Sequence, residues 1–165
     1  MVQNITKYPT PLSLEHSVDV RNFDKKLFAL IADLKDTINE NNLDGLSAFQ
    51  IGSCFNVIVL KNQDGSFLEL INTRLISHSG KIITQEKTAY FGEASAKITR
   101  FERVSIVYQD RDVKDCSLKL EGALAILLQR KLDYSFGSTF LHKLSGSEQD
   151  TFLKQFTKKS WFNLF

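Results

Sequence analysis

Apolar residues recur at every third or fourth position in the first quarter of the chain and form short, denser runs further on. The helical spacing predicts an amphipathic helix over residues 23–40, because it places the apolar side chains on one face. Asn41, Asn42 and Gly45 follow this stretch and indicate where the helix ends. The apolar face consists of Phe23, Leu27, Leu30, Ile31, Leu34 and Ile38.

The denser apolar runs in the middle of the chain predict strands. "FNVIVL" (55–60) and "FLELIN" (67–72) flank the pair Asp64-Gly65, which is typical of a hairpin turn. The remaining signals are a turn at Ser79-Gly80 and short strands or strand ends at "KTAYF" (87–91), "RVSIVYQD" (103–110) and "CSLKLEG" (116–122).

The last third of the chain predicts two helices. Residues 122–135 are apolar nearly all round at first, which favours a central, buried helix that ends near Gly137. Ser147 can cap a last helix that carries the amphipathic stretch "DTFLKQF". The order of helix, antiparallel strands, buried helix and tail helix predicts an α+β fold with a sheet around one central helix.

Composition places the chain among ordinary globular proteins, with 42% hydrophobic and 24% charged residues. Its formal net charge of +2 gives no indication of nucleic-acid binding. No apolar run reaches the roughly 18 residues of a membrane-spanning helix, and residues 1–17 lack the plan of a signal peptide. Without repeats or linkers, we expect one domain over residues 1–165, cytoplasmic or part of a soluble assembly, with Cys54 and Cys116 reduced.

Three motifs in series resemble those of the peptide deformylase family. They read "LDGLSAFQIG" (43–52), "EKTAYFGEASAKITR" (86–100) and "QRKLDYSFG" (129–137), and the likeness extends over about residues 6 to 156. The resemblance implies the deformylase fold, an α+β fold with antiparallel sheets around a central buried helix, an N-terminal helix and a C-terminal helix. The residues that match the family pattern are Gly45, Leu46, Ala48, Gln50, Ile51, Gly52, Glu86, Arg100, Gln129, Asp133 and Gly137.

The resemblance also implies a metal held by a cysteine and two histidines, with a glutamate that moves protons. Thr88, Arg130 and Tyr134 stand at the three ligand positions, and Lys131 stands at the glutamate position. A guanidinium has no lone pair to donate, and neutral hydroxyls are poor ligands for zinc-like metals. We therefore expect no metal, no cofactor and no catalytic residue. The resulting degenerate site consists of Gln50, Thr88, Arg130, Lys131 and Tyr134.

Two questions about this site stay open. Lys131 lies next to Arg130, so its pKa could be lowered enough for it to act as a base or a Schiff-base nucleophile. Glu86 either forms a structural ion pair with Arg100, as the resemblance implies, or compensates the charge of Arg130.

The C-terminal tail, residues 158–165, is rich in aromatic residues after two lysines. The side chains either fold back onto the domain or bind a protein partner, since exposed aromatic residues mark interfaces. The residues concerned are Trp161, Phe162, Leu164 and Phe165.

Taken together, the replaced ligands and the tail predict a catalytically inactive deformylase-like protein. We expect it to act as a structural or protein-binding subunit of a larger assembly, with a protein partner. One alternative is a metal-independent binder of peptide N-termini or nascent chains that retains a peptide groove. Another is an active hydrolase, a peptide deformylase or other amide hydrolase, with a different mechanism.

Overall fold

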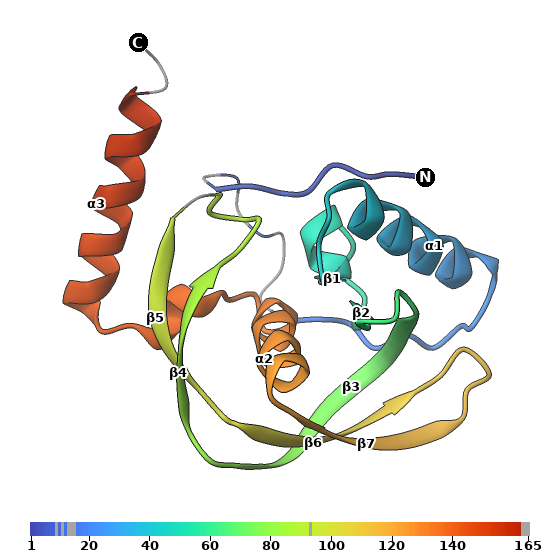
Figure 1. The fold of residues 1–165 in the computed structure, drawn as a ribbon. Coiled ribbons are helices and arrows are strands. Elements are labelled where there is room, and N and C mark those ends of the chain that lie inside the picture. Colours follow the sequence, from blue (N-terminus) through green and yellow to red (C-terminus); the bar gives the residue numbers. More distant parts are fainter. Residues whose placement is uncertain (9, 11, 13–15, 93, 163–165) are drawn as a thin grey trace.

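The computed structural model describes residues 1–8, 10, 12, 16–92 and 94–162, and the backbone alone for residues 155–162 (Figure 1). It confirms the predicted α+β fold with antiparallel sheets and a central helix. In chain order the elements are α1 Lys25–Glu40, β1 Gly45–Ser47, the short 3-10 helix η1 Ala48–Ile51, β2 Val57–Lys61, β3 Phe67–Ser79, β4 Ile82–Lys87, β5 Ser95–Arg100, β6 Arg103–Gln109, β7 Asp115–Glu121, α2 Ala123–Ser135, the 3-10 helix η2 Phe140–Lys143 and α3 Gly146–Phe162.

The main sheet has the strand order β1-β2-β3-β6-β7, and all neighbouring strands are antiparallel. The first part of β3 pairs with β2 and the later part with β6, with a register shift between Ile71 and Arg74 where the partner changes. β4 and β5 form a separate antiparallel pair. Figure 1 shows α2 in the middle of the molecule, with β4 and β5 to one side of it and the long strands of the main sheet below.

The helix α1 confirms the prediction over residues 23–40 with a slightly later start. Asp24 lies just before it and accepts hydrogen bonds from the backbone N–H groups of Lys26 and Leu27, which fixes the first turn. The helix ends at Asn41, and Asn42 has a φ of 51°. The buried apolar side chains of α1 are Leu27, Ile31, Leu34 and Ile38, and they pack in one cluster with residues of β1, η1, β2 and β3.

The helix α2 confirms the predicted buried helix. Its side chains are buried over most of its length, which explains why the sequence shows little polar face. Two residues beyond its end, Gly137 has a φ of 69° and its N–H donates to the carbonyl oxygen of Tyr134 at 2.9 Å. This glycine takes a left-handed conformation that other residues adopt at a cost, as the sequence predicted.

The short strand or strand end predicted at residues 87–91 is confirmed only at its first residue. β4 ends at Lys87, and the following residues turn, with the Phe91 N–H donating to the Thr88 carbonyl oxygen at 3.1 Å. Tyr90 and Phe91 instead pack in an aromatic cluster. The ring centroid of Phe91 lies 5.5 Å from that of Phe140 and 5.1 Å from that of Phe152. Packing, not strand pairing, accounts for this apolar run.

The predicted cap of the last helix is also wrong. Ser145, not Ser147, caps α3, because its hydroxyl accepts from the Glu148 N–H and its own N–H donates to the Glu148 carboxylate, each at 3.3 Å. This reciprocal pair is a capping box. Ser147 lies inside the first turn of the helix.

The tail prediction lies outside the described residues, because the side chains of Trp161 and Phe162, and all of Leu164 and Phe165, are not described. The expectation of a single domain stays a prediction. Among the helices that the structure describes, none is long and apolar enough to cross a membrane.

Candidate functional site

The candidate site begins at Gln50, in the short helix that follows β1. Ser47 precedes η1, and its N–H donates to Gln50 Oε1 at 3.1 Å, which fixes the amide in one orientation. Gln50 is only 1% exposed. Its Nε2 is buried without a hydrogen-bond partner among the described residues. A buried donor of this kind can stabilise an oxyanion in a substrate.

Lys131 approaches Gln50 from α2. Its Nζ donates to Gln50 Oε1 at 3.1 Å and lies 5.5 Å from the centroid of the Tyr134 ring. Burial, and next the neighbouring charge of Arg130, lower the pKa of Lys131 to about 7, while Asp44 and Glu86 oppose the change. An amine with this pKa is neutral in a large fraction of molecules near neutral pH and can accept a proton.

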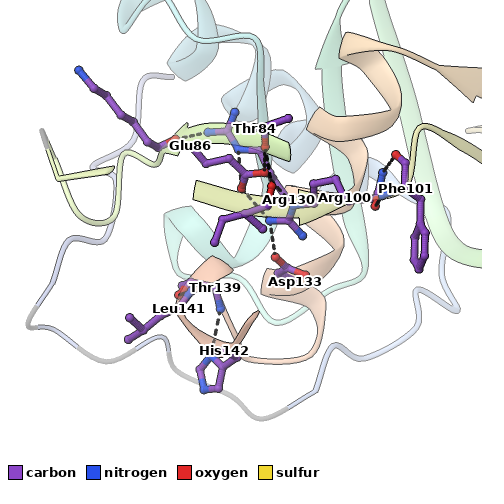
Figure 2. Close-up of polar contacts among 12 residues, drawn as sticks. Thr84, Glu86, Arg100, Phe101, Arg130, Asp133, Thr139, Leu141 and His142 are labelled. Atoms are coloured by element: carbon purple, nitrogen blue, oxygen red, sulfur yellow. Dashed lines mark hydrogen bonds and ion pairs between the residues drawn. The ribbon is translucent and has the colours of Figure 1, made fainter. Parts of the chain in front are cut away.

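A buried network of ion pairs joins β4, β5 and α2 (Figure 2), and the charge of its Glu86 acts on the Lys131 amine. Arg100 donates to both carboxylate oxygens of Glu86 at 2.8 Å, and its Nη2 also lies 2.9 Å from Asp133 Oδ2. Burial raises the pKa of the Asp133 carboxyl, whereas Arg100 lowers it. The interaction of Arg100 with two carboxylates joins β4 and β5 to each other and to α2.

Arg130 also contacts this network. Its Nη2 donates to the backbone oxygen of Lys87, and its Nε lies 3.8 Å from Glu86 Oε1. The structure therefore gives Glu86 both partners that the sequence left open, with Arg100 the nearer one. Arg130 is 24% exposed, so the site is open to solvent at this point.

Thr88 and Tyr134 complete the site. Thr88 follows β4 and is buried, and Tyr134 is 1% exposed. Burial raises the pKa of Tyr134 to about 12, and the Thr88 hydroxyl beside it opposes the rise. Both side chains are therefore uncharged near neutral pH.

The structure thus brings the predicted site residues together around one side of α2, although they come from distant parts of the sequence. It adds two residues that sequence reasoning did not assign to the site. Ser47 orients Gln50, and Asp133 pairs with Arg100. The third motif could have placed Asp133 in the site, since Asp133 is one of the residues that match it. Within the described ranges, no group of three or more His, Cys, Asp or Glu side chains could hold a metal ion.

Comparisons with known proteins give consistent matches over nearly the whole chain. A family model described as polypeptide deformylase matches residues 2–150. The peptide deformylase of Wolinella succinogenes is 32% identical over 94% of this chain and 95% of its own length. That of Aquifex aeolicus is 32% identical over 96% of both chains. The crystal structure of a peptide deformylase from Legionella pneumophila superposes with a TM-score of 0.89 at 25% identity, over 99% of this chain and 98% of the other.

These matches overturn the expectation of an inactive, structural protein. The curated relatives are named as enzymes at about 30% identity over most of the chain, and the matched family is an enzyme family. The prediction of a pseudoenzyme that serves as a structural subunit is therefore wrong. That prediction assumed that replacement of the metal ligands removes all catalytic function. The structure instead places an amine of lowered pKa against Gln50. The alternative of an active hydrolase agrees better with the comparisons.

Proposed function

Because the chain belongs to the polypeptide deformylase family, we propose that it hydrolyses the formyl amide at peptide N-termini and that Lys131 is its general base. One observation carries the proposal. The buried Lys131 amine, with a pKa of about 7, lies 3.1 Å from a Gln50 side chain whose Nε2 has no partner among the described residues. A base beside a free oxyanion donor is the minimum machinery for amide hydrolysis.

The residues at the metal positions of the family do not fit a divalent metal. Arg130 has no lone pair to donate, and Tyr134, with its pKa raised to about 12, remains a neutral phenol. Thr88 offers a neutral hydroxyl, and Arg130 adds a fixed positive charge that repels a cation. We infer that the chain lacks the metal ligands and the glutamate of the family, and no step of the proposed reaction uses a metal.

The proposed reaction needs one water molecule and the peptide. The neutral Lys131 amine takes a proton from the water, and the resulting hydroxide adds to the formyl carbon. The carbonyl oxygen becomes an oxyanion that accepts a hydrogen bond from Gln50 Nε2. The Lys131 ammonium then gives its proton to the amide nitrogen, the C–N bond breaks, and formic acid and a free amino terminus are released. Base and acid are thus the same group, used in succession.

Neighbouring residues support this cycle by their charge. The charge of Arg130 lowers the pKa of Lys131, because a nearby like charge disfavours the ammonium form. Glu86 has the opposite effect, and its charge is largely compensated by Arg100. The balance places the pKa of Lys131 near the pH at which general base catalysis is most effective.

The test is a formate-release assay on a formyl-Met peptide, with protein purified and assayed in the presence of a chelator. We expect slow but catalytic turnover in the wild type, which is lost in Lys131→Met, a neutral side chain of similar length. Lys119→Met, an exposed lysine on β7, is the matched control and should retain the wild-type rate. Absence of turnover in folded wild-type protein, or turnover that requires added metal and survives Lys131→Met, would overturn the proposal.

A further inference from the structure

A second pocket lies against the opposite side of α2. It has a volume of about 460 Å³, within the range of small-molecule sites. Leu132, Asp133 and Phe136 line it, whereas none of the candidate-site residues Arg130, Lys131 and Tyr134 does. Its other walls come from residues of the N-terminal segment, the main sheet and η2. The pocket therefore lies on the other side of α2 from Lys131, although it shares Arg100 and Asp133 with the ion-pair network beside the proposed active site.

Asp133 Oδ2 in this pocket has no hydrogen-bond partner among the described residues but forms an ion pair with Arg100. Three further buried polar atoms of the pocket have neither a hydrogen bond nor an ion pair among the described residues. They are Asn56 Oδ1, Thr73 Oγ1 and Ser135 Oγ, on side chains that are 2%, 3% and 5% exposed. Each buried polar group left unpaired costs about 1–3 kcal/mol, so proteins rarely keep several in one place without a use. Their gathering around one cavity indicates a ligand that pairs with them.

Backbone features hold these groups in position. Thr73 lies at the register shift between Ile71 and Arg74, and its carbonyl oxygen accepts from Asn56 Nδ2 at 3.3 Å. That bond uses the Asn56 amide nitrogen and leaves the Asn56 oxygen, an acceptor, without a partner among the described residues. Ser135 ends α2, and its carbonyl oxygen accepts from the Ser17 N–H at 2.7 Å. The pocket thus offers one acceptor and two hydroxyls, which can donate or accept.

The arginines around the pocket already have ionic partners. Arg74 makes a bidentate pair with Asp19, at 2.8 and 2.7 Å. Arg100 pairs with Glu86 and with Asp133, so neither the guanidinium nor the Asp133 carboxylate is left for a ligand of opposite charge. His16 and Lys143 are exposed on the rim. The interior of the pocket therefore favours an uncharged ligand.

Apolar side chains form the rest of the wall. Leu132 is buried, and Leu75 and Phe136 are 38% and 64% exposed. The ring of Phe136 meets that of His16 edge-on, with 6.1 Å between centroids. Apolar exposure of this kind beside buried polar groups suits a ligand with a polar head and an apolar body.

We propose that this pocket binds a small, uncharged amide with an apolar body. An amide carries an N–H donor, which Asn56 Oδ1 requires, and a carbonyl oxygen, which the Thr73 or Ser135 hydroxyl can bond. A carboxylate would lack the donor and meet the Asn56 and Asp133 oxygens, and an amine would lack the acceptor. The neutral head thus distinguishes this site from an anion or cation site.

Three probes of the same size and different charge test the proposal. Benzamide, benzoate and benzylamine are titrated separately into the full-length protein, and backbone amide chemical shifts are followed by NMR. We expect benzamide to shift the resonances of residues around Thr73 and Ser135, and to bind at least tenfold tighter than the two charged probes. Stronger binding of benzoate or benzylamine, or no binding of benzamide because the pocket holds water only, would overturn the proposal.

Two variants that remove one hydroxyl each locate the binding. Thr73→Val keeps the shape of the side chain, and Ser135→Ala removes the smallest possible group. We expect each to weaken benzamide binding about fivefold to tenfold, the effect of one hydrogen bond. Ser77→Ala, an exposed hydroxyl further along β3 and outside the pocket, is the matched control and should bind as the wild type does. Unchanged binding in both Thr73→Val and Ser135→Ala would place benzamide elsewhere and refute the site.

Discussion

Lys131 Nζ donates a hydrogen bond to Gln50 Oε1 at 3.1 Å, and both side chains are almost completely buried. The contact joins α2 to η1 across 81 positions of the sequence. In the part of the chain that the structure describes, the near contacts of this amine are an amide oxygen and a ring face, which explains why burial lowers its pKa so strongly.

The lowered pKa of Lys131 predicts how activity depends on pH. The base works only when neutral, so kcat/KM for a formyl-Met peptide should rise with pH and level off above about 7. Arg130→Gln removes a charge that lowers this pKa, so it should move the rise to higher pH. A pH profile that is flat in the wild type, or the same in Arg130→Gln, would contradict the assignment of Lys131.

The same pKa predicts a stability difference that needs no activity. Between about pH 7 and 10.5 the unfolded chain holds a proton on Lys131 that the folded chain has lost, so this group's contribution to stability rises with pH across that window. Lys131→Met should therefore be more stable than the wild type at pH 7, with an advantage of a few kcal/mol that shrinks toward pH 10. Denaturant unfolding at several pH values measures it. A constant difference would argue against a buried lysine of lowered pKa.

The buried network around Arg100 predicts a large loss of stability when one partner loses its charge. Glu86→Gln leaves part of the Arg100 charge uncompensated inside the protein, and should cost about 3–5 kcal/mol in the free energy of unfolding. Asp19→Asn breaks the exposed pair with Arg74 and is the matched control, with an expected cost below about 1 kcal/mol. Similar losses in the two variants would mean that Glu86 does not have the role described.

Restoration of the family's ligands predicts recovery of metal binding. The variant with Thr88→Cys, Arg130→His, Lys131→Glu and Tyr134→His replaces the cationic and neutral groups with ligands that zinc prefers. We expect one equivalent of zinc by elemental analysis of the folded variant. A triple variant that retains Thr88 and carries the other three changes has two of the three ligands and should hold less zinc. A folded quadruple variant that takes up no metal would show that the cavity does not preserve the ligand geometry.

The aromatic tail yields a prediction that does not depend on the described residues. We propose that Trp161 packs on the domain and that Leu164 and Phe165 bind a protein partner. Trp161→Ala should then lower the melting temperature, since burial of a large side chain contributes a few kcal/mol. Deletion of residues 164–165 should leave the melting temperature unchanged and reduce co-purification of a stoichiometric partner. A deletion variant that still retains its partner would refute this role.

The two long helices were predictable because their signals are local. In α1, the spacing of apolar residues and the Asn41-Asn42 end are visible in the sequence. In α2, the apolar run that becomes buried is visible there as well. The β4–β5 pair was not predictable from hydropathy. Its buried positions include the charged Glu86 and Arg100, whereas Ile83 is 71% exposed, so at these three positions the usual relation between polarity and burial is reversed. Only the ion pair between the two strands and α2 explains this inversion.

The candidate site was predictable in its membership but not in its chemistry. The motifs placed Gln50, Arg130 and Lys131 at one site, and the charge of Arg130 suggested a lowered pKa for Lys131. Burial is nevertheless the larger cause, and it depends on contacts with residues far along the chain. The unpaired Nε2 of Gln50 is likewise invisible in the sequence, because it depends on which atoms surround the amide.

The helix α2 lies between the Lys131–Gln50 contact and the second pocket, so consecutive residues along it serve different sites: Lys131 contacts Gln50, and Leu132 and Asp133 line the second pocket. Each residue inserted into a helix rotates everything after it by about 100°. A one-residue insertion near the start of Ala123–Ser135 would thus turn the later side chains of the helix away from both sites, and would disable both together. An insertion in the hairpin at Asp64-Gly65 would disturb neither, so the length of α2 is far less adjustable than the length of that hairpin.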